Sequence, residues 1–231
     1  MIITIGGIKG GTGKTTVATN FACIAAGQGS KVLLVDADDQ KTASDFTAAR
    51  NQDHPDAPQY TCIRLTGKNV RTEIMKIAAD YDHIVIDTGG RDTTSQRAAL
   101  TLSQTLLIPF APRSFDIWTM DQVTSLVEDM GAVNAELRAV AFLNHADAQG
   151  KGTENRDAAS MLQEHPSVTF LDTPLGRRKA YSHAATQGLA VTELGRPHRN
   201  QLAIDEVMAL FRYCFDVTVA SPTTAAEEAL R

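Results

Sequence analysis

Two lysines lie five residues apart in the stretch IGGIKGGTGKTTVATN (5–20), among glycines and threonines. Lys14 stands between a glycine and Thr15, the order found in loops that bind the phosphates of a nucleotide. Glycines let backbone N–H groups face an anion, a lysine contacts the β- and γ-phosphates, and a hydroxyl can hold Mg²⁺. The usual pattern has a further glycine where this chain has Ile8. The stretch predicts a nucleotide-binding loop and leaves the purpose of the second lysine, Lys9, to be explained.

Two other segments end in carboxylates that such a site would use. KVLLVDADDQ (31–40) contains Asp36 and Asp38 near its end, and HIVIDTGG (83–90) contains Asp87 before two glycines. Because the carboxyl ends of parallel strands lie along one edge of a sheet, these acids can reach the same phosphates. A single acid after a strand is often a helix cap, but two such ends beside a glycine loop favour a site for a nucleotide and Mg²⁺.

Short apolar runs alternate with helical patterns along the chain, as in βαβ units. Buried strands are predicted at 2–5, 31–36, 60–65, 83–87, 104–110, 137–144 and 168–171. Helices are predicted at 14–27, 69–80, 92–101, 116–130, 153–164, 177–187 and 199–214, with a polar loop at 51–59. The pattern predicts a single-domain α/β fold of the P-loop NTPase type, with a mostly parallel central sheet and helices on both faces. Residues 1–215 would form this domain and 216–231 a loosely held tail.

Composition argues against several other classes of protein. Of 231 residues, 43% are hydrophobic, and no run approaches the roughly 20 apolar residues of a membrane span. The start lacks the regions of a signal peptide, and the three cysteines are scattered, which fits a reducing cytoplasm. The formal net charge is −5, so contact with nucleic acid would need a local basic patch. One lies between residues 177 and 212, where six basic residues stand against three acidic ones.

The stretch KGGTGKTT (9–16) resembles the deviant Walker A box of the ParA/MinD family of P-loop ATPases. In that family the first lysine of the box reaches across a dimer interface to the partner's nucleotide, and the resemblance gives this role to Lys9. Lys9 and Lys14 would then stabilise charge during hydrolysis, as an arginine finger does. The resemblance implies that ATP is bound by Lys9, Gly10, Gly11, Thr12, Gly13, Lys14, Thr15 and Thr16.

The two acidic segments resemble the switch regions of the same family. VDADDQ is similar to switch I, which implies that Asp38 orients or activates the attacking water and that Asp36 lies near Mg²⁺. IDTGG is similar to switch II, which implies that Asp87, together with Thr15, holds Mg²⁺. The family has a proline where this chain has Asp39, a change expected to loosen switch I or to alter the rate of hydrolysis.

Two further sets of residues are implied by the resemblance. In the family an asparagine at a strand end and a proline-containing loop hold adenine, and Asn144 and Pro174 match those positions. Both could equally be ordinary turn residues. Late basic residues in ParA chains form a dimer-dependent surface for non-specific DNA, for which phosphate contacts suffice. The matching residues, for which a solvated helix face is the alternative, are Arg177, Arg178, Lys179, Arg196 and Arg199.

These features predict a ParA-type ATPase with ATP and Mg²⁺ as ligands, located in the cytoplasm on the nucleoid. ATP would drive formation of a homodimer that binds DNA, and a ParB-like adaptor would stimulate hydrolysis to position a cargo: a plasmid, a chromosome or a protein assembly. A small-molecule synthetase or kinase is the alternative, and would not need Lys9. A MinD-like membrane ATPase would need a basic amphipathic helix, unlike the tail TTAAEEALR, so no membrane contact is expected. An iron–sulfur reductase would need differently placed cysteines.

Overall fold

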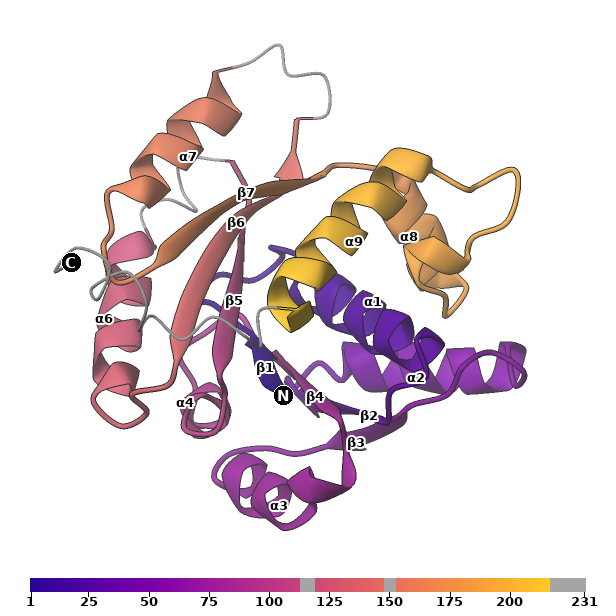
Figure 1. Cartoon of the computed structure of the whole chain (residues 1–231), viewed down its shortest axis with the longest axis horizontal. Coiled ribbons are helices and arrows are strands. Elements are labelled where there is room, and N and C mark those ends of the chain that lie inside the picture. Colours follow the sequence, from indigo (N-terminus) through magenta and orange to yellow (C-terminus); the bar gives the residue numbers. More distant parts are fainter. Residues whose placement is uncertain (113–118, 148–152, 217–231) are drawn as a thin grey trace, which may run out of the picture.

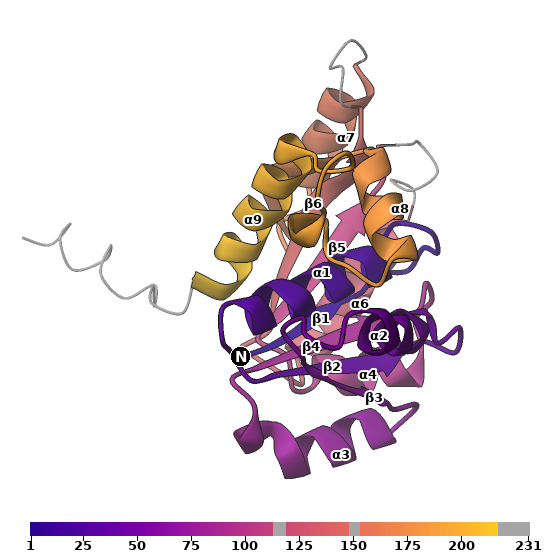
Figure 2. The same ribbon diagram turned by 90° about the vertical axis from the view of Figure 1, so that its right-hand side faces the viewer.

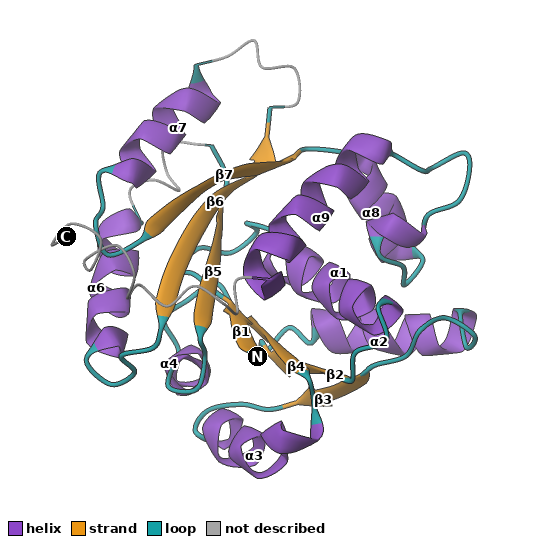
Figure 3. Cartoon of the chain, viewed as in Figure 1, coloured by secondary structure: helices purple, strands orange, loops and turns teal. Residues whose placement is uncertain are grey.

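A seven-stranded sheet forms the middle of the molecule, and its strand pairs are all parallel. The computed structural model describes residues 1–112, 119–147 and 153–216. The sheet has the order β3-β2-β4-β1-β5-β6-β7 (Figure 1; Figure 3). The strands are β1 (Ile2–Ile5), β2 (Val32–Ala37), β3 (Thr61–Arg64), β4 (His83–Thr88), β5 (Thr105–Phe110), β6 (Arg138–Ala146) and β7 (Thr169–Gly176). Because β1 pairs with both β4 and β5, the glycine loop leaves the centre of the sheet.

Helices cover both faces of the sheet (Figure 1; Figure 2). One face carries α1 (Lys14–Gly27), α2 (Thr42–Asp53), α8 (Lys179–Thr186) and α9 (Gln201–Asp216). The other carries α3 (Asn69–Ile77), α4 (Thr94–Leu100), α6 (Met120–Gly131) and α7 (Glu154–Gln163). Short 3₁₀ turns lie at Ala78–Asp80 and Val191–Glu193. Among the helices of the described ranges, none has the length and apolar character needed to cross a membrane.

Along each strand, alternate residues pack against the helices on opposite faces of the sheet. In β2, Val32 and Leu34 belong to the core shared with α1 and α9, whereas Leu33 and Val35 belong to the core shared with α3 and α4. Both sets are buried, which explains why the strands appear in the sequence as continuous apolar runs. The structure is therefore a single α/β domain with a parallel sheet and helices on both faces, as predicted.

Every predicted strand is present, and each predicted helix has a counterpart; α1 has the predicted ends, and the other helices differ slightly at theirs. The start of the helix predicted at 116–130 and the tail residues 217–231 lie outside the described residues. The sequence does not predict α2, and the polar loop predicted at 51–59 begins only after this helix ends at Asp53. The strand predicted at 168–171 runs on to Gly176.

Helix α2 escaped prediction for a physical reason. The buried residues of α2 have the spacing of one helix face; they are Ala43, Phe46, Thr47 and Arg50. Two of the four are polar, so the apolar pattern is weak. The first turn is capped by the Asp36 carboxylate, which accepts the backbone N–H of Ser44 at 2.8 Å. A cap from eight residues upstream is not a local sequence signal.

Candidate nucleotide-binding site

The glycine loop between β1 and α1 lies against the end of β6. Gly13 has φ +89°, and a Cβ atom at this position would collide with the Nδ2 atom of Asn144. That nitrogen donates to the carbonyl of Thr12 at 2.6 Å, which fixes the loop on the strand. A side chain at position 13 would therefore strain the backbone and displace Asn144.

The Lys14 side chain is buried at the start of α1, and its Nζ donates to the carbonyl of Lys9 at 2.7 Å. Burial lowers the pKa of this ammonium, while the carboxylates of Asp87 and Asp38 act in the opposite direction. The side chain of Lys14 is thus bonded to the backbone of Lys9. A phosphate oxygen in place of that carbonyl would receive a charge-assisted hydrogen bond.

Thr15 and Asp87 meet beside Lys14. Oγ1 of Thr15 donates to Oδ2 of Asp87 at 2.7 Å, whereas Oδ1 of Asp87 is buried and has no hydrogen-bond partner among the described residues. Burial raises the pKa of this carboxyl to about 7, and the neighbouring Asp36 adds to the rise. Hydroxyl and carboxylate oxygens are ligands that Mg²⁺ prefers, so the unpartnered oxygen fits a metal ion. Thr15 and Asp87 could together hold Mg²⁺.

Asp36 lies next to Asp87 in the sheet register, but its carboxylate is already engaged. Oδ1 accepts the backbone N–H of Asp38 at 3.2 Å. Oδ2 accepts both the N–H and the hydroxyl of Ser44, at 2.8 and 2.7 Å. Asp36 therefore holds the β2–α2 loop in place, and its location near Mg²⁺ stays a prediction.

A cavity of about 710 Å³, called the phosphate cavity here, opens over the glycine loop. Asp38 reaches it from the β2–α2 loop, and one oxygen of this carboxylate accepts the N–H of Gln40 at 3.2 Å. Lys9 is half-buried and is not part of the lining. The lining residues come from the glycine loop, the β2–α2 loop, the β4–α4 loop and β6; they are Gly10, Gly11, Gly13, Lys14, Thr15, Thr16, Asp38, Asp39, Gln40, Gly89, Gly90, Arg91, Thr93 and His145.

A second cavity, of about 680 Å³, adjoins the first, and Thr16 and His145 line both. It lies between the ends of β6 and β7 and helix α8, and its wall includes Asn144, Leu175 and Tyr181. Small-molecule pockets typically combine an apolar wall with a few placed polar groups. The two cavities therefore suit a nucleoside beside its phosphates, and the second is called the nucleoside cavity here.

Pro174 does not lie where the sequence predicts it. It belongs to β7 and not to a turn, it is exposed, and it is not among the described residues that line either cavity. Between Leu171 and Leu175 the pairing slips, because β7 advances by four residues while β6 advances by two. Such a bulge accommodates a residue that has no N–H to donate. Leu175 and Gly176 line the nucleoside cavity in its place.

The five basic residues predicted to contact DNA fall into two groups. Arg177, Arg178 and Lys179 line the nucleoside cavity, whereas Arg196 and Arg199 are exposed in the turn before α9. The ring centroids of His183 and His198 are 4.2 Å apart, which brings this turn beside α8. The two groups therefore lie on neighbouring segments.

Arg178 differs from the other four basic residues because it has an acidic partner. Its guanidinium makes a bidentate ion pair with Glu206 of α9, with Nε at 3.0 Å from Oε2. The same carboxylate accepts the backbone N–H of Gly176 at 3.1 Å. Arg178 thus holds the end of β7 on α9, and its charge is largely neutralised there.

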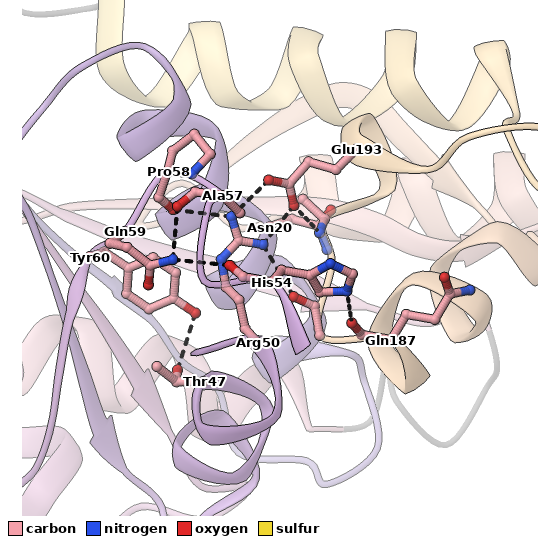
Figure 4. Close-up of polar contacts among 12 residues, drawn as sticks. Asn20, Thr47, Arg50, His54, Ala57, Pro58, Gln59, Tyr60, Gln187 and Glu193 are labelled. Carbon is pink, nitrogen blue, oxygen red and sulfur yellow. Dashed lines mark hydrogen bonds and ion pairs between the residues drawn. The ribbon is translucent and has the colours of Figure 1, made fainter. Parts of the chain in front are cut away.

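A buried polar cluster joins the helices around the site (Figure 4). Arg50 of α2 is fully buried, and its Nη1 and Nη2 atoms donate to the two oxygens of Glu193 at 2.8 and 2.7 Å. Nη1 also donates to the carbonyl of Gly188. Asn20 of α1 accepts the N–H of Val191 at 2.8 Å. The glycine-loop helix, α2 and the segment after α8 are therefore fastened together.

Three residues at the site were missed by the sequence analysis: Ser44, Arg91 and His145. Ser44 acts through Asp36, a contact that no local motif announces. His145 has φ +55°, a conformation that depends on the irregular pairing of β6 with β7. Arg91 follows the two glycines after β4, and its place at a strand end was a signal that could have been used.

Comparison with known proteins gives consistent matches. A family model described as the CobQ/CobB/MinD/ParA nucleotide binding domain matches residues 3–191. The "Maintenance of carboxysome distribution protein A" of Halothiobacillus neapolitanus is 28% identical over 209 residues, covering 89% of this chain and 92% of that protein. The protein of the same name from Gloeobacter kilaueensis is 30% identical over 191 residues, covering 80% and 81%. An McdA–ATP complex from Cyanothece has the same fold, with a TM-score of 0.76 at 16% identity, covering 95% of this chain and 98% of that one.

The matched region runs from β1 to the 3₁₀ turn at Val191–Glu193. It contains the glycine loop, both acidic strand ends and most of the lining of the two cavities. The sequence match and the geometry thus concern the same residues. The chain belongs to the ParA/MinD family of P-loop nucleotide-binding proteins.

Proposed function

We propose that this chain is a ParA-type positioning ATPase, which binds ATP, dimerises, holds DNA non-specifically and hydrolyses ATP when a partner protein engages it. The observation that carries the proposal is the placement of Lys9, whose carbonyl lies 2.7 Å from the Nζ of Lys14. A second cationic side chain thus starts at the phosphate site, from where it can serve a nucleotide across a dimer interface. A small-molecule synthetase or kinase has no need of this lysine.

The reaction requires the chain to hold a triphosphate and position one water. Loop N–H groups and Lys14 would bind the β- and γ-phosphates, and Asp38 would orient the water in the phosphate cavity. Thr15 and Asp87 would hold Mg²⁺, which supplies positive charge to the phosphate oxygens. The water oxygen bonds to the γ-phosphorus, and the bond to the bridging oxygen breaks with its electron pair staying on ADP. Loss of the γ-phosphate would then release the loops that contact it.

DNA would be held by exposed cations around α8. Arg177, Lys179, Arg196 and Arg199 are exposed, and phosphate contacts by such residues need no base recognition. Arg178 is a weaker candidate because Glu206 already neutralises it. Arg177 and Lys179 also line the nucleoside cavity, so a bound nucleotide can alter their arrangement. This proximity supports DNA binding that depends on ATP, and hence a location on the nucleoid.

The relatives suggest the class of cargo. Two of them are named for maintaining carboxysome distribution, and both align with at least 80% of this chain. A protein assembly is therefore the favoured cargo, ahead of a plasmid or a chromosome. An adaptor protein would link that assembly to the ATP-bound dimer and stimulate hydrolysis.

The deciding experiment measures binding of a fluorescent DNA duplex of arbitrary sequence without nucleotide, with ADP and with ATP. The variant Asp38→Ala is included because the proposed role of Asp38 predicts that it slows hydrolysis and holds the ATP state. We expect binding only with ATP, weakening as salt rises. Joint replacement of Arg196 and Arg199 by alanine should weaken DNA binding strongly. Arg71 is an exposed arginine of α3, and its replacement by alanine is the control that should leave DNA binding unchanged.

Two results would contradict the proposal. Absence of DNA binding in every state, with ATP hydrolysis that depends on a small-molecule acceptor, would favour a synthetase or kinase. ATP-dependent binding to anionic lipid vesicles without DNA binding would favour a membrane-positioning ATPase of the MinD type.

A further inference from the structure

The loop between β4 and α4 (residues 89–93) lies directly on the glycine loop. A Cβ atom on Gly90 would lie only 2.5 Å from the Cα of Gly10 and 2.8 Å from the carbonyl carbon of Lys9. A Cβ atom on Gly89 would lie 3.2 Å from an oxygen of Asp38. Gly90 therefore permits a backbone approach that any side chain would prevent, and Gly89 lies close to the Asp38 carboxylate.

The far end of this loop is anchored as well. Asp92 makes an ion pair with Arg97 of α4 at 2.7 Å. Thr93 caps α4, since its Oγ1 accepts the N–H of Gln96 at 3.1 Å. Gln96 in turn accepts the N–H of Gly7, at the start of the glycine loop, at 3.1 Å. The residue at position 91 lies between the two glycines and these anchoring contacts, so its backbone is fixed on both sides.

That residue is Arg91, an exposed arginine that lines the phosphate cavity. Arg97, six residues later, is paired with Asp92 and Asp129. By contrast, no described residue forms an ion pair or hydrogen bond with Arg91. Asp39, which lines the same cavity, is likewise unpaired within the described ranges. A guanidinium with no ion-pair or hydrogen-bond partner among the described residues therefore stands at the phosphate cavity.

We propose that Arg91 contacts the γ-phosphate of ATP bound in the same subunit and stabilises the negative charge that develops during hydrolysis. This inference rests on the proposed ATPase function and adds a catalytic residue to it. As the water oxygen bonds to the γ-phosphorus and the bridging oxygen leaves with ADP, charge spreads over the equatorial phosphate oxygens. Arg91 would donate two N–H groups to those oxygens while its own proton count stays unchanged.

An arginine suits this position better than either lysine of the glycine loop. Lys14 is buried and fixed at the floor of the site, where its Nζ already donates to a loop carbonyl. Arg91 reaches the cavity from a different loop, one that lies close to both Gly10 and Asp38. A planar guanidinium can grip two oxygens at once, which an ammonium cannot do in the same geometry. Lys14 and Arg91 would thus hold the γ-phosphate from two sides.

The test compares Arg91→Ala and Arg91→Lys with the wild type, and uses Arg71→Ala on α3 as the matched loss of one exposed arginine. Binding of ADP and of the non-hydrolysable analogue AMPPNP is measured at nanomolar protein, and light scattering checks that the chain is monomeric there. We expect Arg91→Ala to weaken AMPPNP about tenfold and ADP less than about twofold. The value of kcat should fall about 100-fold, with partial recovery in Arg91→Lys. Arg71→Ala should match the wild type in its affinity for ADP, its affinity for AMPPNP and its kcat.

Three outcomes would overturn the inference. They are an unchanged kcat, an equal weakening of ADP and AMPPNP, and a weakening of AMPPNP binding that appears only at concentrations that support a dimer, which would place Arg91 on the partner's nucleotide. Failure of the proposed function can be distinguished from failure of this inference. A wild type that hydrolyses ATP but binds no DNA would contradict the positioning role, while the ratio of the wild-type kcat to that of Arg91→Ala would still decide the role of Arg91. A wild type that binds no ATP would overturn both.

Discussion

One oxygen of the Asp87 carboxyl accepts a hydrogen bond from Thr15, and the other has no partner among the described residues. Burial raises the pKa of this carboxyl to about 7, so its charged form is disfavoured in the folded protein. A carboxyl whose pKa is raised by folding stabilises the fold most when it is protonated. The contribution of Asp87 is therefore complete below the pKa that an aspartate has in the unfolded chain, and it is lost as pH rises toward 7. Without metal or nucleotide, Asp87 therefore destabilises the fold at neutral pH and above.

We predict that Asp87→Asn stabilises the free protein at pH 8, on the order of 3 kcal/mol, because it removes a buried charge while keeping the shape. Chemical denaturation from pH 5 to pH 8 without Mg²⁺ measures this. The wild-type free energy of unfolding should fall over that range, and the variant's should fall less. The exposed Asp80, replaced by asparagine, is the control. A variant as unstable as the wild type at pH 8 would argue against a buried charge.

Lys9→Ala tests the second lysine of the glycine loop. The hydrogen bond from Lys14 goes to the backbone carbonyl at position 9, so it survives removal of the side chain. We therefore expect the monomer to bind ATP within about threefold of the wild type, a difference below roughly 1 kcal/mol. The ATP-dependent dimer, measured by light scattering in the Asp38→Ala background, should be lost. A persistent dimer would remove Lys9 from its proposed role.

At the scale of elements, the sequence predicts best where structure depends on local signals. The glycine loop was located because an apolar strand, glycines and a helix follow one another directly. The rule that parallel strands end at one edge predicted that Asp87 lies near the glycine loop, and the hydrogen bond that Asp87 accepts from Thr15, 72 residues away, agrees with it. Element order, sheet type and the phosphate side of the site were all accessible in this way.

The elements that escaped prediction depend on partners distant in sequence. Helix α2 is capped by Asp36 and buries Arg50 against Glu193, 143 residues later. The extension of β7 through Pro174 depends on its bulged pairing with β6. The nucleoside side of the site is formed by such elements, so its residues could be assigned only once β7 and α8 were placed. Local patterns carry no information about these tertiary contacts.

Arg50→Ala tests the contact between α2 and the segment after α8. The change leaves the Glu193 carboxylate without its cation and creates a cavity, so we expect a loss of about 3 kcal/mol in the free energy of unfolding, the low end for a broken buried pair. Urea denaturation measures it. Arg97→Ala is the matched control, because its ion pairs are exposed and should contribute less than about 1 kcal/mol. Equal losses in the two variants would contradict the importance of burial.

At the scale of the whole molecule, charge is unevenly distributed. The net charge is −5, yet Arg177, Lys179, Arg196 and Arg199 are exposed around α8. We predict that log K for DNA falls linearly with log salt, and that Arg196→Ala lowers the steepness of this slope by about 2, one released counterion for each of two subunits. Titrations at four salt concentrations measure it. A parallel shift with unchanged slope would show that Arg196 does not contact phosphate.

The position of β1 at the centre of the sheet also has a consequence for synthesis of the chain. Ile2 pairs with Ile84, and Ile3 also pairs with Thr105, so both neighbours of β1 are made long after it. Asn144, which fixes the glycine loop through the carbonyl of Thr12, is made later still. A nascent chain therefore leaves the ribosome with its first strand unpaired, as an apolar segment open to chaperones or to aggregation. The phosphate-binding loop therefore takes its final shape only after a residue 132 positions later in the chain has been translated.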